Sequence, residues 1–281
     1  MAEAVTRGAA TAAAATDAAA ATAGPALQAR IAATEADLRG AERLRYRVFV
    51  EELGGGGALV DPVGRYERDE FDPVCDHLVL VDPARDPAGH DHVIAAYRLL
   101  PSDRAEAFGR FYCDAEYDLA PLRASGRRLL ELGRSCVDAD HRGGAAMFLL
   151  WNALADYVLD RRIEVMFGVA SFHGTDVEAL RRPLAWLHHH HLAPEPLRVR
   201  SRAFQPMDLV AKDDLDRRQA MLEMPALIKA YLRLGGFVGE GAFVDRPFNT
   251  TDVCLLMDTE AMSAKHKGFY TRKADPGRGR G

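Results

Sequence analysis

A carboxylate and a guanidinium group stand three residues apart, at Glu131 and Arg134, inside an otherwise apolar run over residues 129–137. The run predicts a short strand, and a charge on a buried strand needs a partner because burying an isolated charge is costly. Candidate partners stand at the ends of other apolar runs, at Arg45, Asp69, Asp72 and Arg98. We therefore expect a charged cleft built on a sheet, where a carboxylate can act as a general base and arginine can bind an anionic group.

The spacing of Glu131 and Arg134 constrains this cleft. Residues three apart on a regular strand face opposite sides of the sheet, so both charges can point into one cleft only if the strand bulges. Gly133, between them, makes a bulge possible. Arg45 and Asp69 have an equally good alternative as a purely structural ion pair.

The segment after this strand, residues 138–146, predicts a strand-to-helix turn with Gly143 and Gly144 at the helix entrance. Free N–H groups at such an entrance bind anions, and small residues let a ligand approach the backbone. A second glycine run, residues 54–57, is not a phosphate loop, because no strand precedes it and no Lys-Ser/Thr pair follows.

Hydrophobic periodicity predicts the elements that must position these groups. Helices are expected over 27–53, 104–126 (partly irregular), 143–160, 174–187 and 213–234, the last interrupted at Pro225. Strands are expected over 77–81, 93–100, 129–137, 163–170, 237–244 and 253–257. The Pro-, Asp- and Gly-rich segment 82–91 suits a hairpin turn. This mixed α/β pattern, with early hairpin pairing, disfavours a Rossmann sheet.

Composition limits the function classes. A net charge of −5 argues against general nucleic-acid binding, and no apolar run is long enough to span a bilayer. The four cysteines have no metal-ligand spacing and indicate reduced thiols in a cytoplasmic protein. The Ala-rich residues 1–26 predict a disordered tail, 27–262 a single domain, and the basic residues 263–281 a flexible tail that is simply solvated or contacts an anionic membrane or acidic partner.

The turn between residues 137 and 145 and the strands around it resemble the layout of the GCN5-related N-acetyltransferase (GNAT) fold. That resemblance implies a mixed central sheet flanked by helices, here with a C-terminal extension, in which Val137, Arg142, Gly143, Gly144 and Ala145 hold the pantetheine arm of the acyl donor. The usual GNAT turn begins with Gln or Arg, whereas this chain has Asp140-x-x-Gly143-x-Ala145. The missing cation favours a carrier-protein arm with one phosphodiester over coenzyme A.

Four charged motifs also resemble the acyl-homoserine-lactone synthases in order and spacing: Arg45-x-x-Val48-Phe49, Asp69-x-x-Asp72, Arg98-Leu99-Leu100-Pro101 and Glu131-Leu132-Gly133-Arg134. Together with MFGVASFHGTD, PALIKAYLRLGGFVGEGAFVD and FNTTDV, the chain resembles the bacterial ornithine N-acyltransferases from about residue 38 to 270. That resemblance implies transfer of a 3-hydroxyacyl group from acyl carrier protein to the α-amine of L-ornithine, which forms lyso-ornithine lipid.

The same resemblance implies roles for the charged residues: catalytic for Glu131, Arg98 and Arg134, and substrate-binding for Arg45, Asp69 and Asp72. The absence of Ser-His-Asp and cysteine-nucleophile patterns favours direct attack by the amine. Because lactone synthases share these charges, amine choice is expected in the C-terminal part, at Lys229, Arg233, Glu240, Asp245, Asn249 and Asp252. No metal or redox cofactor is implied, and the histidines 188–191 predict a helix end.

Acyl carrier protein and L-ornithine are the expected partners, with transient contact at the cytoplasmic face of the inner membrane. Three alternatives stay open: an acyl-homoserine-lactone synthase, an N-acyltransferase for another amino acid, and a non-enzymatic membrane-active protein. The last would need an amphipathic lytic segment.

Overall fold

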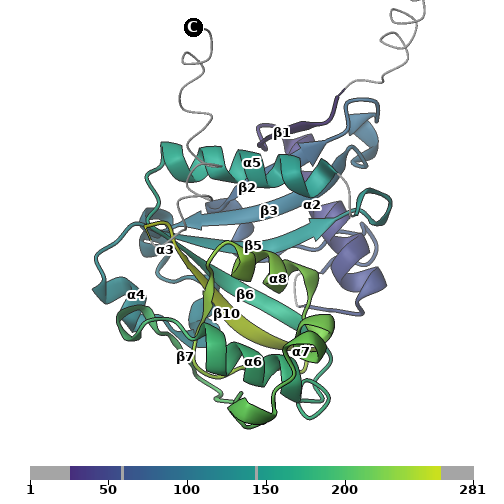
Figure 1. The fold of residues 1–281 in the computed structure, drawn as a ribbon. Helices are drawn as coiled ribbons and strands as arrows, with labels where there is room; N and C mark the ends of the chain where they lie inside the picture. The colour runs from purple at the N-terminus through teal and green to yellow at the C-terminus, as the bar shows by residue number, and fades with distance from the viewer. Residues whose placement is uncertain (1–25, 58–59, 143–144, 261–281) are drawn as a thin grey trace, which may run out of the picture.

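One large sheet organises the molecule. The computed structural model describes residues 26–57, 60–142 and 145–260, and within them an eight-stranded sheet has the order β1-β2-β3-β5-β6-β10-β8, with β9 also paired to β10 (Figure 1). The strands are β1 (Gln28–Ile31), β2 (Asp76–Val81), β3 (Val93–Pro101), β5 (Leu129–Val137), β6 (Val165–His173), β8 (Phe237–Val238), β9 (Phe243–Asp245) and β10 (Thr250–Asp258). Only β5 and β6 are parallel neighbours among these strands. A second, two-stranded sheet joins β4 (Tyr117–Asp118) and β7 (Arg200–Ser201).

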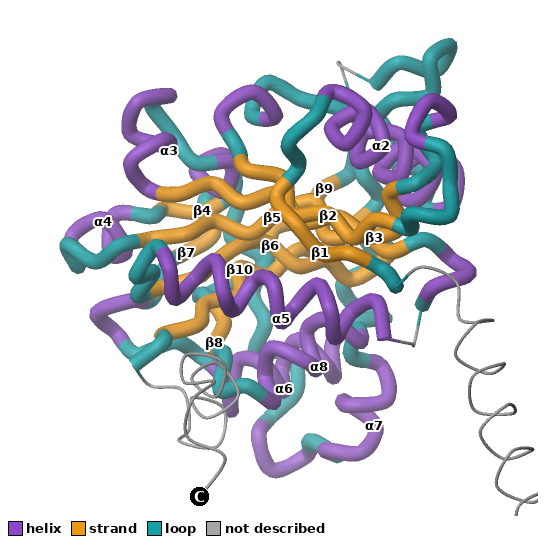
Figure 2. Tube along the Cα trace, turned by 90° about the horizontal axis from the view of Figure 1, so that it is seen from above, coloured by secondary structure: helices purple, strands orange, loops and turns teal. Residues whose placement is uncertain are grey.

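Helices cover both faces of the large sheet (Figure 2). The α-helices are α2 (Glu35–Arg45), α3 (Ser102–Phe108), α4 (Ala120–Ala124), α5 (Ala145–Asp160), α6 (Arg181–His191), α7 (Arg217–Glu223) and α8 (Ala226–Arg233). A π-helix, η1 (Tyr46–Glu52), continues α2 directly. The short 3-10 helices are η2 (Asp72–Val74), η3 (Pro87–Gly89), η4 (Tyr112–Ala115), η5 (Ala139–His141), η6 (Glu195–Leu197) and η7 (Lys212–Asp214). Figure 2 shows α5, α6, α7 and α8 on one side of the sheet, and α2 and α3 on the other.

The core therefore has two layers of apolar side chains. On the face of α5 it includes Leu130, Leu150 and Met166, and on the opposite face it includes Phe111, Leu122 and Phe167. Consecutive strand residues point to opposite faces, so the apolar runs of β3 and β5 are buried on both sides. In the described part of the chain, no helix has the length and apolarity needed to cross a membrane.

The fold class is confirmed, and so is the hairpin of β2 and β3, which pair antiparallel. The strand predicted over 129–137 is β5 with the same bounds, the helices before and after Pro225 are α7 and α8, and the histidine run ends α6. The four cysteines are free thiols, all buried. The predicted tails, except residue 26, and the glycines Gly143 and Gly144 lie outside the described residues.

Two predicted helices are wrong in their first part. Residues 28–31 form β1, because this segment pairs antiparallel with β2 at the sheet edge, and α2 begins only after Thr34, whose side chain accepts the N–H of Asp37. The helix expected from residue 174 begins at Arg181. Before it, the Asp176 side chain accepts the N–H groups of Glu178 and Ala179, which favours a turn.

Candidate active site

The site lies where two parallel strands separate. Strands β5 and β6 pair only at Leu129–Val165, Leu130–Met166 and Glu131–Phe167, although both strands continue for six more residues. The space between their diverging halves opens a path through the sheet. Gly168 lies at the point of separation, where a β-carbon would meet the carbonyl oxygen of Leu132. A side chain at this position would force the strands apart.

A bulge in β5 brings Glu131 and Arg134 to the same cavity. Along the β3 ladder Ala96 pairs with Cys136 and Arg98 pairs with Gly133, so β5 holds one residue more than β3 in this interval. Arg134 has a φ of 49°, in the left-handed region, which is costly for a residue with a β-carbon. The bulge that the glycine at 133 allowed is therefore present, and both charged side chains line the cavity.

Three arginines and three acids form a closed ring of ion pairs behind one wall of this cavity. Arg134 Nε and Nη2 lie 3.1 Å from Glu67 and 3.1 Å from Asp69, respectively. Arg98 Nη1 contacts Asp69, and lies 3.2 Å from Asp72. The partners alternate in the order Arg45, Glu67, Arg134, Asp69, Arg98, Asp72 and back to Arg45. Each cation thus lies between two anions, so the ring has no net charge.

The ring is buried and held from several elements. Arg45, the last residue of α2, is 1% exposed, and its Nη1 and Nη2 donate to Asp72 at 2.6 and 3.0 Å. Burial alone would raise the pKa of Asp72, but the Arg45 guanidinium outweighs it and holds that pKa well below its usual range. Burial would also raise the pKa of Asp69, but Arg98 and Arg134 lower it below its ordinary value. Asp69 and Asp72 therefore stay ionised and keep the arginines in place.

The predicted substrate-binding residues fall into this ring and not on the cavity wall. Arg98 and Arg134 line the cavity, whereas Arg45, Asp69 and Asp72 are not among the residues that line it. Arg45 does form ion pairs, although with Glu67 and Asp72 and not with Asp69. Glu67 was not among the candidates predicted from the sequence, although it stands two residues before Asp69 in the same acidic segment. The positions of Arg45, Asp69 and Asp72 therefore suit a role in holding the two cavity-lining arginines better than direct contact with a substrate.

Glu131 is held apart from the ring by the backbone of η4. Its Oε2 accepts the N–H of Tyr112 at 2.8 Å and its Oε1 accepts the N–H of Cys113 at 2.7 Å. The side chain is buried, and burial raises its pKa, against the lowering effect of these hydrogen bonds. Glu131 therefore fixes η4 on the sheet. Tyr112 of η4 in turn stacks under the guanidinium of Arg134, with 4.8 Å from Cζ to the ring centre.

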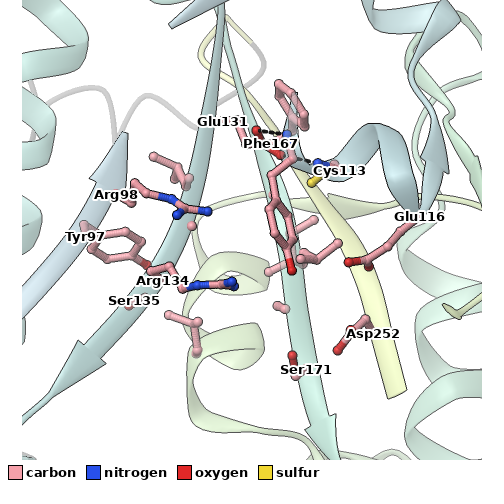
Figure 3. A pocket seen from close by; sticks show the side chains of 18 of the residues that line it. Tyr97, Arg98, Cys113, Glu116, Glu131, Arg134, Ser135, Phe167, Ser171 and Asp252 are labelled. Atoms are coloured by element: carbon pink, nitrogen blue, oxygen red, sulfur yellow. Dashed lines mark hydrogen bonds between the residues drawn. The ribbon is translucent and has the colours of Figure 1, made fainter. Parts of the chain in front are cut away.

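The cavity has a volume of about 280 Å³ and two chemically different sides. Tyr97, Met166 and Tyr231 reach it from the apolar core of the α5 face. Its charged groups gather on the opposite face around η4; they are Arg98, Glu116, Glu131, Arg134, Asp245 and Asp252. Figure 3 shows Arg98 and Arg134 on the side of β3 and β5, and Glu116 and Asp252 on the side of β10. Glu116 was missed by the sequence analysis, which had no motif around it.

A second cavity, of about 630 Å³, adjoins the first at Phe49, Leu53, Ser135 and Leu227, which line both. Its wall is mostly apolar and includes Val137 and Arg142 of the predicted pantetheine turn, together with side chains of α5 and α8. Arg142 Nε donates to the Val137 carbonyl at 3.0 Å, and Nη2 lies 2.6 Å from Glu52. Ala145 is exposed at the start of α5. The two cavities therefore lie next to each other along the diverging strands.

Comparisons with known proteins agree with this architecture. The sequence matches the family described as Acetyltransferase (GNAT) domain over residues 44–152. An L-ornithine N(alpha)-acyltransferase of Rhodobacter capsulatus is 72% identical over 250 residues, covering 89% of this chain and 96% of the relative. The chain belongs to the L-ornithine N(alpha)-acyltransferase family. The member from Brucella abortus is 38% identical over 253 residues, covering 89% of this chain and 90% of that relative.

Among solved structures, a CoA-dependent acyl-homoserine lactone synthase with SAM and isopentyl-CoA is similar, with a TM-score of 0.47 and 16% identity over 89% of this chain and 91% of the other. Membership of the L-ornithine N(alpha)-acyltransferase family confirms the resemblance found in the sequence. The family model covers α2's last residues, the ring, β5, the turn and half of α5. Asp245 and Asp252 lie beyond it, in the C-terminal part.

Proposed function

We propose that this protein transfers a 3-hydroxyacyl group from acyl carrier protein to the α-amine of L-ornithine, which forms lyso-ornithine lipid. The names of the 72% and 38% identical relatives support the ornithine N-acyltransferase activity. The observation that carries the proposal is the cavity between β5 and β6, which joins a charged side to an apolar side through the sheet. An amino acid suits the charged side, and a fatty acyl chain suits the apolar side.

The reaction forms an N–C bond between the amine and the thioester carbonyl carbon and breaks the C–S bond. The proton that the amine loses is passed to the departing sulfur, which leaves as the free thiol of the carrier arm. An α-amino group with a pKa of about 8 is mostly protonated at neutral pH, so attack needs a base. Glu131 is the proposed base, acting directly or through water. Both of its oxygens accept one backbone N–H, and each carboxylate oxygen keeps a second lone pair for the amine proton.

Direct attack is favoured over a covalent acyl-enzyme. Two thiols, Cys75 and Cys113, line the cavity. Burial raises the pKa of Cys75 to about 12 and raises that of Cys113 well above its ordinary value. A thiol that stays protonated is a poor nucleophile, since the thiolate is the reactive form. The amine of the substrate is then the attacking group.

The bulge of β5 is the proposed site of the thioester carbonyl. Arg134 and Ser135 have no register partner in the ladder to β3, and a backbone N–H at this bulge is proposed to donate to the developing oxyanion. Arg98 and Arg134, held in place by the ring, are proposed to bind the carboxylate of the amino acid. No metal or redox cofactor is part of this proposal.

The donor is proposed to enter along the second cavity, with its phosphodiester at the turn between Val137 and α5. Arg142 supplies a cation there, although its sequence position differs from the one usual in GNAT turns. A single cation fits the single phosphodiester of a carrier-protein arm. We further propose that the protein acts in the cytoplasm and contacts the inner membrane transiently, because its product is amphiphilic.

The test uses purified protein with 3-hydroxyacyl carrier protein, a panel of amino acids and mass spectrometry, and coenzyme A thioesters as the second donor. Acylated ornithine from the carrier-protein donor, lost in Glu131→Gln but not in the exposed control Glu106→Gln, supports the function and the base. Acylation of a different amino acid alone contradicts the substrate. Product from coenzyme A thioesters alone contradicts the donor, and consumption of S-adenosylmethionine would instead favour a lactone synthase.

A further inference from the structure

The carboxylates of Glu116, Asp245 and Asp252 meet on the cavity wall opposite the arginines. One oxygen of each lies within 4.8 Å of the others. Glu116 follows η4, Asp245 ends β9 and Asp252 lies near the start of β10. We infer that this acidic trio is the subsite that binds the δ-ammonium group of the amino acid substrate and so selects ornithine. This inference rests on the proposed function and assigns the specificity of that same site.

Two carboxylate oxygens of the trio are buried and have no hydrogen-bond partner among the described residues, which indicates a binding site for a cationic ligand. Glu116 is 4% exposed and Asp252 is 3% exposed. Glu116 Oε2 and Asp252 Oδ1 are buried and have no hydrogen-bond partner in the described part of the protein. Both side chains line the cavity, and Figure 3 shows both pointing into it from the side of β10. Buried carboxylate oxygens are normally hydrogen-bonded, so orphaned oxygens facing a cavity point to a ligand that completes them.

The other groups around the trio do not neutralise it. Asp252 Oδ2 accepts the Thr250 hydroxyl at 3.3 Å, and Asp245 Oδ1 accepts the N–H of Phe248 at 3.1 Å. No ion pair within the described ranges involves any of the three acids. Arg134 is the nearby cation, but its guanidinium lies in the ring between Glu67 and Asp69. Among the described residues, the trio therefore has no cationic partner in ion-pair contact.

The protonation of the trio is consistent with this view. Burial, then the neighbouring Asp252 and Asp245, raises the pKa of Glu116 to about 8, against the opposing effect of Arg134. Burial raises the pKa of Asp252 to about 6; hydrogen bonds from Ser171 and Thr250 lower it, while Asp245 adds to the rise. The charge of Glu131 also raises the pKa of Glu116. A bound ammonium group would replace these protons with a positive charge.

The position of the trio also matches the shape of an amino acid with a basic side chain. Figure 3 shows Arg98 and Arg134 on one side of the cavity and Glu116 and Asp252 on the other. A substrate with a carboxylate at one end and an ammonium group at the other has a group of opposite charge for each side. An amino acid of the same length without the side-chain ammonium would leave buried carboxylates unpaired, and such sites discriminate strongly.

The experiment compares ornithine with norvaline, which has the same carbon chain and lacks the δ-ammonium. We expect the wild type to prefer ornithine by at least about 100-fold in kcat/KM. Glu116→Gln and Asp252→Asn should each reduce this preference about tenfold or more, through a higher KM for ornithine, because a charge-assisted hydrogen bond is lost. The exposed Glu106→Gln and Asp213→Asn are the matched controls and should keep the wild-type preference. Circular dichroism verifies that each variant is folded.

The other possible results would contradict either the ammonium subsite or the proposed function. Variants that lose activity equally toward both amino acids would assign the trio to the α-amine and contradict the inference. Loss of wild-type activity with a chelator, restored by Mg²⁺ or Ca²⁺, would make the trio a metal site and contradict it as well. A wild type that acylates no amino acid overturns the proposed function, and with it this subsite. An active wild type whose variants keep its preference overturns the subsite alone.

Discussion

Gly168 lies directly against the carbonyl oxygen of Leu132: a β-carbon at this glycine would lie 2.1 Å from that oxygen. This contact marks the end of pairing between β5 and β6, since the last paired residues are Glu131 and Phe167. The close approach of the two backbones therefore fixes the point at which the active-site cavity begins. Only a residue without a side chain allows it.

Replacement of Gly168 by alanine should accordingly damage both stability and activity. The added methyl group must displace backbone atoms of β5, so we expect a loss of roughly 1–3 kcal/mol in the free energy of unfolding and at least a tenfold loss of turnover. Urea denaturation and an acyl-transfer assay measure the two effects. Gly89→Ala is the control, because its β-carbon would meet nothing closer than 3.9 Å. Normal turnover in Gly168→Ala would show that this contact does not set the geometry of the cavity.

Replacement of Asp72 by asparagine tests the ring of ion pairs. The change leaves Arg45 and Arg98 buried with one anion fewer, so we expect a loss of about 3–5 kcal/mol in the free energy of unfolding. Asp91→Asn is the control: Asp91 also contacts two arginines but is 48% exposed, so its loss should stay under about 1 kcal/mol. Chemical denaturation of both variants measures these losses in the free energy of unfolding. Equal losses would mean that the ring is no more important than a surface ion pair.

Replacement of Glu116 by glutamine should make stability less dependent on pH. Because the folded protein holds a proton on Glu116 up to a pKa of about 8, and the unfolded chain releases it near pH 4–5, the wild type loses stability as the pH rises through this window. The variant lacks this loss and should be more stable than the wild type at pH 8, by roughly 1–3 kcal/mol. Thermal unfolding at pH 5 and pH 8, without substrate, measures the difference. A parallel pH dependence in both proteins would contradict the protonated state of Glu116.

Replacement of Arg142 by glutamine tests the proposed path of the donor. Arg142 is 47% exposed and lines the second cavity beside Val137. We expect the KM for the acyl donor to rise about 3- to 10-fold, because one cation near the phosphodiester is lost, and the KM for ornithine to stay unchanged. Arg181→Gln, at an equally exposed ion pair on α6, is the control. A change in the KM for ornithine instead would place the amino acid, and not the donor, at this turn.

Much of the fold and part of the site follow from local sequence. The apolar run over residues 129–137 predicted the bounds of β5, and Pro225 predicted the break between α7 and α8. Both signals are local, because each acts within a short stretch of the chain. The charged residues at 45, 69, 72, 98, 131 and 134 were identified by their place in or beside apolar runs. The first residues of the domain were mistaken for helix, because β1 exists only through its pairing with β2.

The tertiary structure alone decided how these charges are used. The ring depends on Glu67 and on the bulge at Arg134, and the pairing that creates the bulge joins residues nearly forty apart. The acidic trio joins Glu116 to Asp245 and Asp252, which lie more than 120 positions later in the chain. No local pattern encodes such contacts, because they arise when strand order and register bring distant segments together. The sequence thus determined which residues carry charge, and the fold determined which of those charges are paired and which remain open to a ligand.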